Sequence, residues 1–406
     1  MTDLLGGTTI LEFGGGAAGP VATRYFADHG ATVIRVESRQ RPDFLRILKL
    51  TPATPGGVDG GEHFAVLNAN KLSVALNLST PEGVGVARRL ALRVDAVAEN
   101  FAPGAMAKWK LDYASLVQER PDLVMISTCL NGQTGPQRFY PGFGGQGSAL
   151  SGFNHLTGWP DRAPLGPYGT ITDSLSPRLA ALLLATALLH RARTGQGQHL
   201  DLSQVEGGIV CLSESIATYT ATGEALGRLG NRSRHAAPHG VFRCSDEDGR
   251  ERWIAIVAHD DADWTRLVQA IGRPAWALDP VLATTTGRLA HVDALEAGLG
   301  EWTRVQQAGP LAESLQRAGV EAAAVLDLAD LHDDPQLAHR RHFRTVEHPV
   351  LGPHPAETHA IRFSDMEPAL RRPAPRLGEH TDAVLRDVLD MPADEIARLR
   401  AAGALE

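Results

Sequence analysis

The sequence predicts an α/β fold: a large domain with a Rossmann-like, mostly parallel sheet, and a smaller α+β domain. Three observations support this prediction. Short β-type runs alternate with helical patterns over residues 1–130, a Gly- and Pro-rich stretch follows from Phe139 to Gly169, and a different order of strand and helices begins after Gly240. We expect the large domain at residues 1–215 and 330–406, and the small domain at residues 216–329.

A β-α-β unit begins the chain, with strands at Thr9–Phe13 and Thr32–Glu37 around a helix at Val21–His29 that Gly30 ends. In a second unit, Thr80 caps a helix that has Pro81 in its first turn. Parallel strands covered on both faces bind ligands at their carboxyl ends. The other expected strands and helices of the first 210 residues are Ser73–Asn77, Gly83–Arg93, Asp95–Glu99, Leu123–Thr128, Ser174–Arg191 and His199–Leu202.

The helix at Ser174–Arg191 is so apolar that we expect it to be buried on all sides. The stretch Phe139–Gly169 is expected to form loops near a site. A Pro-rich tail is expected to run extended over the first domain or over a partner subunit. The remaining predicted elements are a strand at Trp253–Val257 and helices at Asp263–Ile271, Leu311–Ala318, Thr381–Leu389 and Pro392–Ala402.

Charge and cysteine content exclude several classes of protein. With 39 basic and 47 acidic residues, the net charge is -8, which gives no general attraction to nucleic acid or anionic lipid. Three widely spaced cysteines form no metal-binding pattern, so we expect a reduced, cytoplasmic protein without a metal site. The longest near-apolar run, Leu179–Leu189, is shorter than the roughly 20 residues that span a bilayer, so no membrane anchor is expected.

A glycine-rich turn follows the first strand. Its sequence, Gly14-Gly15-Gly16-Ala17-Ala18-Gly19, fits G-x-G-x-x-G, and Glu37 ends the next strand. This pattern is typical of a nucleotide-type ligand at a helix N-terminus, and an NAD-dependent oxidoreductase is one interpretation. The glycines could equally serve only the packing of helix on sheet.

Asp173 is the candidate catalytic residue. As the last residue before the helix predicted at Ser174, it would be an N-cap whose pKa the helix dipole lowers. The alternative is a carboxylate nucleophile at the end of a Gly-rich loop. The chain has no G-x-S-x-G, P-loop or H-E-x-x-H motif, so the usual markers of serine hydrolysis, P-loop phosphoryl transfer and zinc proteolysis are missing.

Eight segments, in order along nearly the whole chain, carry a family resemblance. They are Leu11–Phe13 with Ala18–Pro20, Gly30–Glu37, Asn68–Ser73, Glu99–Met106, Gly132–Pro136, Arg193–Ser203, Asp334–Leu337 and Ala374–Thr381. Together they resemble the class III CoA-transferases, which include formyl-CoA transferase, carnitine CoA-transferase and alpha-methylacyl-CoA racemase.

The resemblance implies that Asp173 attacks an acyl-CoA thioester and forms covalent aspartyl intermediates while CoA moves to a carboxylic acid acceptor. It also implies an interlocked homodimer, with coenzyme A as a substrate and no permanently bound cofactor. Phe143 stands where the racemase branch has a proton-carrying His, so racemisation is disfavoured but stays an alternative. Arg234 or His235 contacting a substrate carboxylate is a further hypothesis. The implied CoA contacts are Gly16, Ala17, Arg39, Leu72, Asn100, Phe101, Lys108 and Arg138.

Overall fold

The computed structural model describes residues 3–366 and 370–406, which form two compact units. The first unit comprises Met1–His155, Leu165–Leu226 and Gln336–Glu406, and the second comprises Leu156–Pro164 and Gly227–Pro335. The second unit thus interrupts the sequence of the first.

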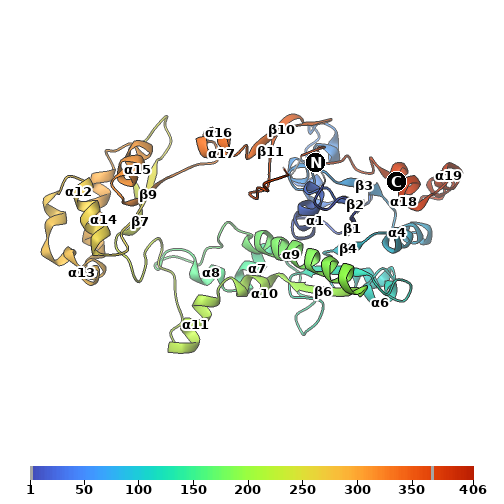
Figure 1. Ribbon diagram of the computed structural model, residues 1–406, viewed down its shortest axis with the longest axis horizontal. Coiled ribbons are helices and arrows are strands. Elements are labelled where there is room, and N and C mark those ends of the chain that lie inside the picture. The colour runs from blue at the N-terminus through green and yellow to red at the C-terminus, as the bar shows by residue number, and fades with distance from the viewer. Residues whose placement is uncertain (1–2, 367–369) are drawn as a thin grey trace. The chain divides into compact units, whose positions relative to one another are not determined.

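The first unit contains a six-stranded parallel sheet in the order β3-β2-β1-β4-β5-β6 (Figure 1). The strand order reverses between β1 and β4, so the loops that follow these two strands flank the position where such sheets bind ligands. The strands are β1 Thr9–Phe13, β2 Thr32–Glu37, β3 Leu72–Ala75, β4 Ala96–Glu99, β5 Val124–Cys129 and β6 Gln198–Ser203.

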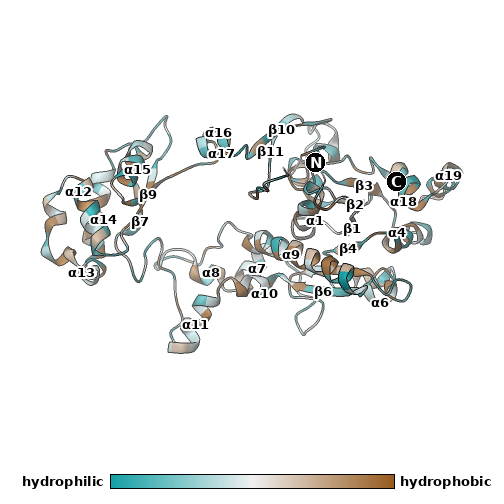
Figure 2. Ribbon diagram, in the orientation of Figure 1, coloured by the Kyte–Doolittle hydropathy of each residue, from teal (hydrophilic) through white to brown (hydrophobic). Residues whose placement is uncertain are grey.

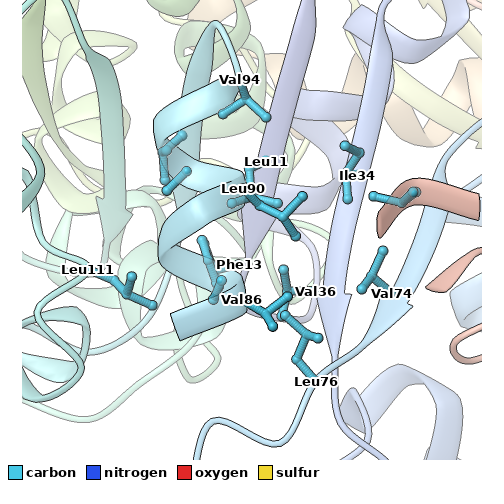
Figure 3. Close-up of a cluster of buried hydrophobic side chains, with 14 of the residues drawn as sticks. Leu11, Phe13, Ile34, Val36, Val74, Leu76, Val86, Leu90, Val94 and Leu111 are labelled. Atoms are coloured by element: carbon cyan, nitrogen blue, oxygen red, sulfur yellow. The ribbon is translucent and has the colours of Figure 1, made fainter. Parts of the chain in front are cut away.

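Helices cover both faces of this sheet because successive strand residues point to opposite sides. Leu11 of β1 joins a core with Val74, Leu90 and Leu385, part of which Figure 3 shows, whereas its neighbour Ile10 packs into the core that contains α1 and α9. The helices of the first unit are α1 Ala18–Asp28, α2 Phe44–Ile47, η1 Gly57–Gly60, α3 Glu62–Leu67, α4 Pro81–Arg93, α5 Ala105–Lys108, α6 Tyr113–Leu116, α7 Gly144–Leu150, α8 Phe153–Leu156, α9 Ile171–Thr194, α10 Gln204–Val210, α11 Ser213–Thr222, α17 Pro335–His339, α18 Thr381–Leu389 and α19 Ala393–Ala401; α8 and α17 each extend one residue into the second unit.

The second unit has a three-stranded antiparallel sheet, ordered β7-β8-β9, packed with helices around its own apolar core. The predicted strand Trp253–Val257 is its central strand. Its elements are β7 His239–Arg243, β8 Trp253–Val257, β9 Glu321–Val325, α12 Asp261–Ala270, η2 Ala275–Leu278, η3 Pro280–Ala283, α13 Thr285–Ala290, α14 Val292–Thr303, α15 Ala308–Arg317 and α16 Asp330–Asp333.

The C-terminal tail belongs to the first unit and lies along it. Strands β10 Phe343–His348 and β11 Gly352–Glu357 form an antiparallel hairpin. Beyond them, the backbone N–H groups of Arg371 and Arg372 donate to the Asn70 side chain at 2.7 and 3.1 Å. Part of the tail therefore lies over the first domain, one of its two expected courses, and the course over a partner subunit stays a prediction.

Two predictions about the middle of the chain were wrong. The stretch 139–169 was expected to form loops, but it contains α7 and α8; of its glycines, Gly144 and Gly147 are helical where residues of α9 pack directly on them, and much of the rest of the stretch is loop as expected. Helix α9 is not buried on all sides: Leu184 is 1% exposed on the sheet, whereas Leu182 is 63% exposed (Figure 2 shows brown residues along α9). By length and composition alone α9 is long and apolar enough to cross a membrane, but the core helices of soluble proteins also meet these two criteria.

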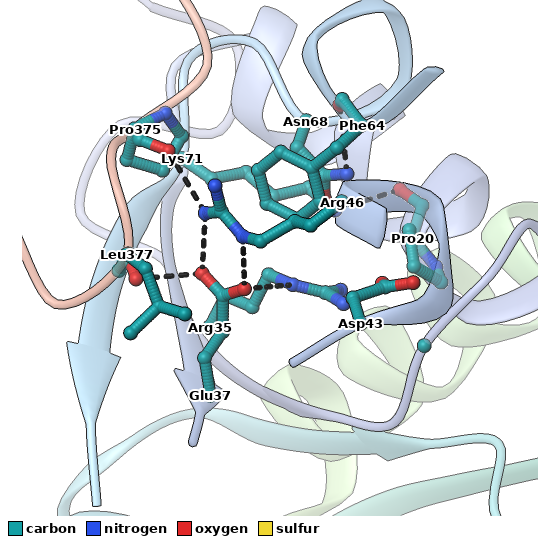
Figure 4. A network of polar contacts seen from close by, with 12 residues as sticks. Pro20, Arg35, Glu37, Asp43, Arg46, Phe64, Asn68, Lys71, Pro375 and Leu377 are labelled. Carbon is teal, nitrogen blue, oxygen red and sulfur yellow. Dashed lines mark hydrogen bonds and ion pairs between the residues drawn. The ribbon is translucent and has the colours of Figure 1, made fainter. Parts of the chain in front are cut away.

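A buried network of charges lies at the carboxyl ends of β1 and β2 (Figure 4). The Arg35 guanidinium pairs with Glu12 and Asp43, and Lys71 Nζ lies 2.7 Å from Glu12 Oε2. Burial on its own raises the pKa of Glu12, but Lys71 and Arg35 outweigh burial and hold the pKa below its ordinary value. Burial also lowers the pKa of Lys71 to about 8, although the charge of Glu12 works against this lowering.

A second buried pair joins the network to the tail. Arg46 binds both carboxylate oxygens of Glu37, at 2.7 and 2.8 Å, and donates to the Pro375 carbonyl at 2.9 Å. Its guanidinium carbon lies 3.5 Å from the centre of the Phe64 ring. A residue 329 positions away in the sequence is thus held to the end of β2.

Replacing Arg35 with Met should lower the free energy of unfolding by about 3 kcal/mol or more, because it leaves the buried carboxylate of Asp43 without its cation. Arg89→Met is the matched control, since Arg89 pairs with Glu395 at 2.6 Å at the surface and should cost less than about 1 kcal/mol. Urea denaturation measures both. Equal losses in the two variants would contradict this account.

Candidate active site

Asp173 lies in the first turn of α9, not before it. The helix begins at Ile171 with Thr170 as N-cap, so the predicted start at Ser174 and the predicted capping role of Asp173 were wrong. The reason is tertiary: Thr172 is buried, and its hydroxyl donates to the Gly144 carbonyl at 3.0 Å. This contact with α7 stabilises the first turn of α9, which begins at Ile171 and which local helix propensity did not predict.

The Asp173 carboxylate is half-buried and has a donor on each oxygen. Gly144 N–H donates to Oδ2 at 3.1 Å, and Gln204 Nε2 donates to Oδ1 at 3.0 Å. Burial raises the pKa of Asp173, and the bonds from Gln204 and Gly144 offset only part of this effect. The predicted lowering of the pKa was therefore wrong, because desolvation outweighs the stabilising contacts.

Glycines allow the N-terminal turn of α7 to touch the N-terminal turn of α9. A Cβ atom on Gly144 would lie 2.3 Å from Asp173 Oδ2, and one on Gly147 would lie 2.4 Å from Thr172 Oγ1. Neither distance is possible for a real side chain. The carboxylate thus lies against one peptide N–H group, that of Gly144, and one side-chain amide, that of Gln204, and both hydrogen bonds stabilise its negative charge.

A cavity of about 690 Å³ lies at the carboxyl ends of β1 and β2. Among the predicted residues, Phe101 and Lys108 line it, together with Trp109, which packs edge-on against Phe101 at 5.7 Å. Arg41 and Lys108 supply exposed positive charge at its walls. An anionic ligand with a flat aromatic group fits this combination of charge and rings.

The chain itself occupies the polar groups of the glycine-rich turn. Asn100 accepts from Gly15 N–H at 3.1 Å and donates to the Gly15 carbonyl at 2.7 Å. Both carboxylate oxygens of Asp43 accept from Gly16 N–H at 3.2 Å, at the position where a dinucleotide would place phosphate. The Glu37 carboxylate is paired with Arg46. The two features that favoured NAD, the glycine-rich turn and Glu37, are therefore both bound by other residues of the chain.

The remaining predicted residues do not converge on this cavity. The Arg39 guanidinium donates to the Leu377 carbonyl at 3.1 Å, and Leu72 lines a separate cavity beside Asn70 at the start of β3. Arg138 is exposed, with its guanidinium 4.5 Å from the centre of the Phe139 ring.

The turn itself contributes Gly14 and Gly15 to the cavity wall, whereas Gly16 is buried. Ala17 caps α1. Arg234 and His235 lie in the second unit, and their contact with substrate stays a prediction.

Two features of the site were not predicted from sequence. Gln204, the first residue of α10, follows β6 directly, and its position at the carboxyl end of a parallel strand was the available signal. Phe44 and Phe143 meet with ring centroids 5.5 Å apart. Because Phe44 lines the cavity and Phe143 precedes Gly144, this aromatic pair connects the cavity wall with the residue that binds Asp173.

Comparisons with known proteins agree with this geometry. The sequence matches CoA-transferase family III over residues 5–381. It is 34% identical to succinyl-CoA–D-citramalate CoA-transferase of Chloroflexus aurantiacus over 97% of this chain and 96% of that protein. It is 30% identical to the beta subunit of succinyl-CoA–L-malate CoA-transferase from the same organism, over 98% and 96%. A CAIB/BAIF family protein from Brucella suis has the same fold, with a TM-score of 0.86, 30% identity and coverage of 96% of this chain and 100% of that one.

A parallel sheet with a carboxylate and an anion-compatible cavity on one unit is therefore the framework of a transferase. The chain belongs to CoA-transferase family III and is a class III CoA-transferase, an enzyme that uses CoA thioesters as substrates.

Gly144→Ala should reduce CoA-transfer activity by about a hundredfold or more, because the added methyl group would displace the Asp173 carboxylate from its donors. Gly145→Ala is the control: its Cβ would meet only the Gly169 carbonyl oxygen, at 3.3 Å. Steady-state kinetics with thermal unfolding of each variant separates loss of the site from loss of the fold. A fully active, folded Gly144→Ala variant would contradict the close packing.

Proposed function

We propose that this enzyme moves CoA from an acyl-CoA donor to a carboxylic acid acceptor, with Asp173 as the covalent nucleophile. The observation that carries the proposal is the Asp173 carboxylate, held by Gly144 N–H and the Gln204 amide in the first turn of α9. Burial, which raises its pKa, also makes the carboxylate a better nucleophile than a fully hydrated one.

The transfer takes four steps that balance without any other reagent. An Asp173 oxygen attacks the donor thioester carbon, the C–S bond breaks, and an aspartyl-acyl anhydride and CoA thiolate form. The thiolate attacks the Asp173 carbonyl carbon and releases the donor acid, which leaves an aspartyl-CoA thioester. The acceptor carboxylate then attacks this thioester to form a new anhydride and thiolate, and the thiolate takes the acceptor acyl group and restores Asp173.

The hydrogen bonds at Asp173 suit the second and third steps. In both, attack on the Asp173 carbonyl carbon puts negative charge on an oxygen of Asp173 itself. Gly144 N–H and Gln204 Nε2 lie 3.1 and 3.0 Å from these oxygens before any reaction. They need little rearrangement to stabilise the developing oxyanion.

The cavity at the ends of β1 and β2 is the proposed site for coenzyme A. Phe101 and Trp109 offer rings for the adenine, and Lys108 and Arg41 offer charge for the phosphates. The Phe44–Phe143 pair supports a path from this cavity to Asp173 for the pantetheine arm. Coenzyme A and acyl-CoA enter this proposal as substrates, not as a resident cofactor.

The relatives suggest which donor to test first, because two of them are named for succinyl-CoA. We therefore propose succinyl-CoA as the first donor and a carboxylic acid as acceptor. Racemisation is not favoured, since the Phe143 ring beside Gly144 cannot carry a proton.

A homodimer is part of the proposal. Leu182 and Leu189 on α9 are 63% and 50% exposed, and Val210 and Tyr219 on α10 and α11 are 65% and 58% exposed. Large apolar side chains exposed on neighbouring helices are typical of a surface that another chain covers. A second copy of this chain, as the family resemblance implies, is the proposed occupant.

Incubation with succinyl-CoA followed by hydroxylamine should leave a hydroxamate on Asp173. The tryptic peptide Ala163–Arg178 contains Asp173 as its only Asp, Glu, Lys or Cys, so an adduct found there by mass spectrometry maps to one side chain. Asp173→Asn should abolish both adduct and transfer, and Asp122→Asn, a surface carboxylate paired with Arg120, should change neither. Transfer activity that survives in Asp173→Asn would overturn the mechanism.

Gln204→Met should slow transfer by about a hundredfold and shift the pH profile. The bond from Gln204 lowers the pKa of Asp173, so its removal raises that pKa further. Since the nucleophile is the carboxylate, activity lost on acidification should then be lost at a higher pH than in the wild type. Gln118→Met, at an exposed residue, is the control, and an unshifted acid limb in Gln204→Met would contradict the assignment.

A further inference from the structure

A second cavity, of about 280 Å³, lies behind the wall of the first one, at the carboxyl ends of β4 and β5. Residues 99–109 separate the two cavities, and Ala102 lines both. Phe101 and Lys108 face the first cavity, whereas Glu99 and Met106 face the second. A change in the second cavity can therefore reach the proposed CoA site through one short segment.

Glu99 holds this segment from the side of the second cavity. It is 4% exposed, and its Oε2 accepts from Phe101 N–H at 2.8 Å. The other carboxyl oxygen of Glu99, Oε1, lies 3.4 Å from Gln133 Nε2. The Ser127 hydroxyl also donates to the Glu99 carboxyl group. Asn100, between Glu99 and Phe101, grips Gly15 of the glycine-rich turn. The Glu99 carboxyl group thus fixes the segment that carries Phe101, whose ring lines the first cavity, and Asn100, which bonds Gly15.

The groups facing Glu99 come from each neighbouring element. His199 and Asp201 are on β6, Cys129 is on β5, and Asp112 precedes α6. His199 Nε2 lies 2.9 Å from the Ser127 hydroxyl, and Tyr113 stacks on the His199 ring.

Burial, with a smaller contribution from Asp201, raises the pKa of Glu99 to about 7 against its bonds from Ser127 and Phe101. Burial lowers the pKa of His199 and raises that of Cys129 to about 11, so these two are neutral near pH 7. Glu99 therefore changes charge near neutral pH while His199 and Cys129 do not.

We infer that Glu99 is a positioning residue for the first cavity, and that its neutral acid holds residues 100–109 in place more firmly than its carboxylate does. The physical reason is linkage between protonation and conformation. The Glu99 carboxyl group is buried in the observed arrangement, so it binds its proton more tightly there than in any arrangement in which water reaches it. Loss of the proton therefore shifts the population toward hydrated arrangements of the wall. In these, Phe101 and the Asn100 clamp are displaced.

The inference rests on the proposed function only for the identity of the ligand, coenzyme A. Its sign is fixed: affinity for CoA is higher below the pKa of Glu99 and falls as pH rises through it. Glu99→Gln keeps the size of the side chain and an oxygen for Phe101 N–H, and it cannot ionise. This variant should therefore keep the tighter affinity at every pH.

Calorimetric titration of CoA at about pH 6.5 and about pH 8.5 tests this. The wild type should bind up to about fourfold more weakly at the higher pH, the limit that linkage sets for a group with a pKa of about 7, and Glu99→Gln should change by less than about 1.5-fold. Asp112→Asn removes a carboxylate from the same cavity without touching the bond to Phe101, and it should behave as the wild type does. The same pH ratio in the wild type and Glu99→Gln would overturn the inference.

Hydrogen exchange at the Phe101 amide tests the wall without CoA. After correction for the intrinsic pH dependence of exchange, protection should fall between these two pH values in the wild type and stay constant in Glu99→Gln. Protection that does not change in the wild type would overturn the role of Glu99 even if CoA binds. Normal pH-dependent protection without CoA binding would instead overturn the proposed function.

Discussion

The buried guanidinium of Arg35 is the constraint on which the ligand-binding end of the sheet depends. It pairs with Glu12 on β1 and with Asp43 after β2. Asp43 in turn accepts from the Gly16 N–H, so the charge of Arg35 on β2 helps to fix the glycine-rich turn that follows β1. Buried ion pairs contribute little net stability, but removing one partner leaves the other charge buried and unpaired, which disfavours other arrangements of these residues. The observed arrangement sets the shape of the cavity.

The Asp173 carboxylate, the proposed nucleophile, is held in a different way, by close approach of backbone without a charged partner. Gly144 and Gly147 let α7 lie against α9, and the Asp173 carboxylate accepts from the Gly144 N–H and the Gln204 amide, two neutral donors, in place of lysine or arginine. A cation would hold the carboxylate more tightly and make it a poorer nucleophile. Neutral donors keep the Asp173 carboxylate in place without a cation, which suits the proposed role as nucleophile. The charge network and the α7–α9 contact are connected through the rings of Phe44, which follows Asp43, and Phe143, which precedes Gly144.

Local patterns sufficed for the sheet but not for the contacts that build the site. The limits of β1, β2 and α18 agree with the prediction because hydrophobic alternation and helix-ending residues are local signals. Helix α7 was missed because Gly-Gly-Gln-Gly has low helix propensity, and its stability comes from α9.

At Asp173, spacing alone allowed a cap or a nucleophile; the structure excludes the cap, and the role of nucleophile, which the family resemblance implies, stays a prediction. Phe101 and Lys108 lie at the cavity as that resemblance implied, but Arg39 turns to the tail, which no local pattern shows.

The position of α18 has a consequence for the growing chain. All six strands of the parallel sheet precede residue 204, whereas Val384 and Leu385, which cover Val74 and Leu76, follow the entire second unit. At typical rates of translation, roughly ten to forty seconds separate β6 from α18. During that interval the nascent polypeptide on the ribosome carries all six strands with part of one apolar face of the sheet uncovered, which exposes it to aggregation and to chaperone binding.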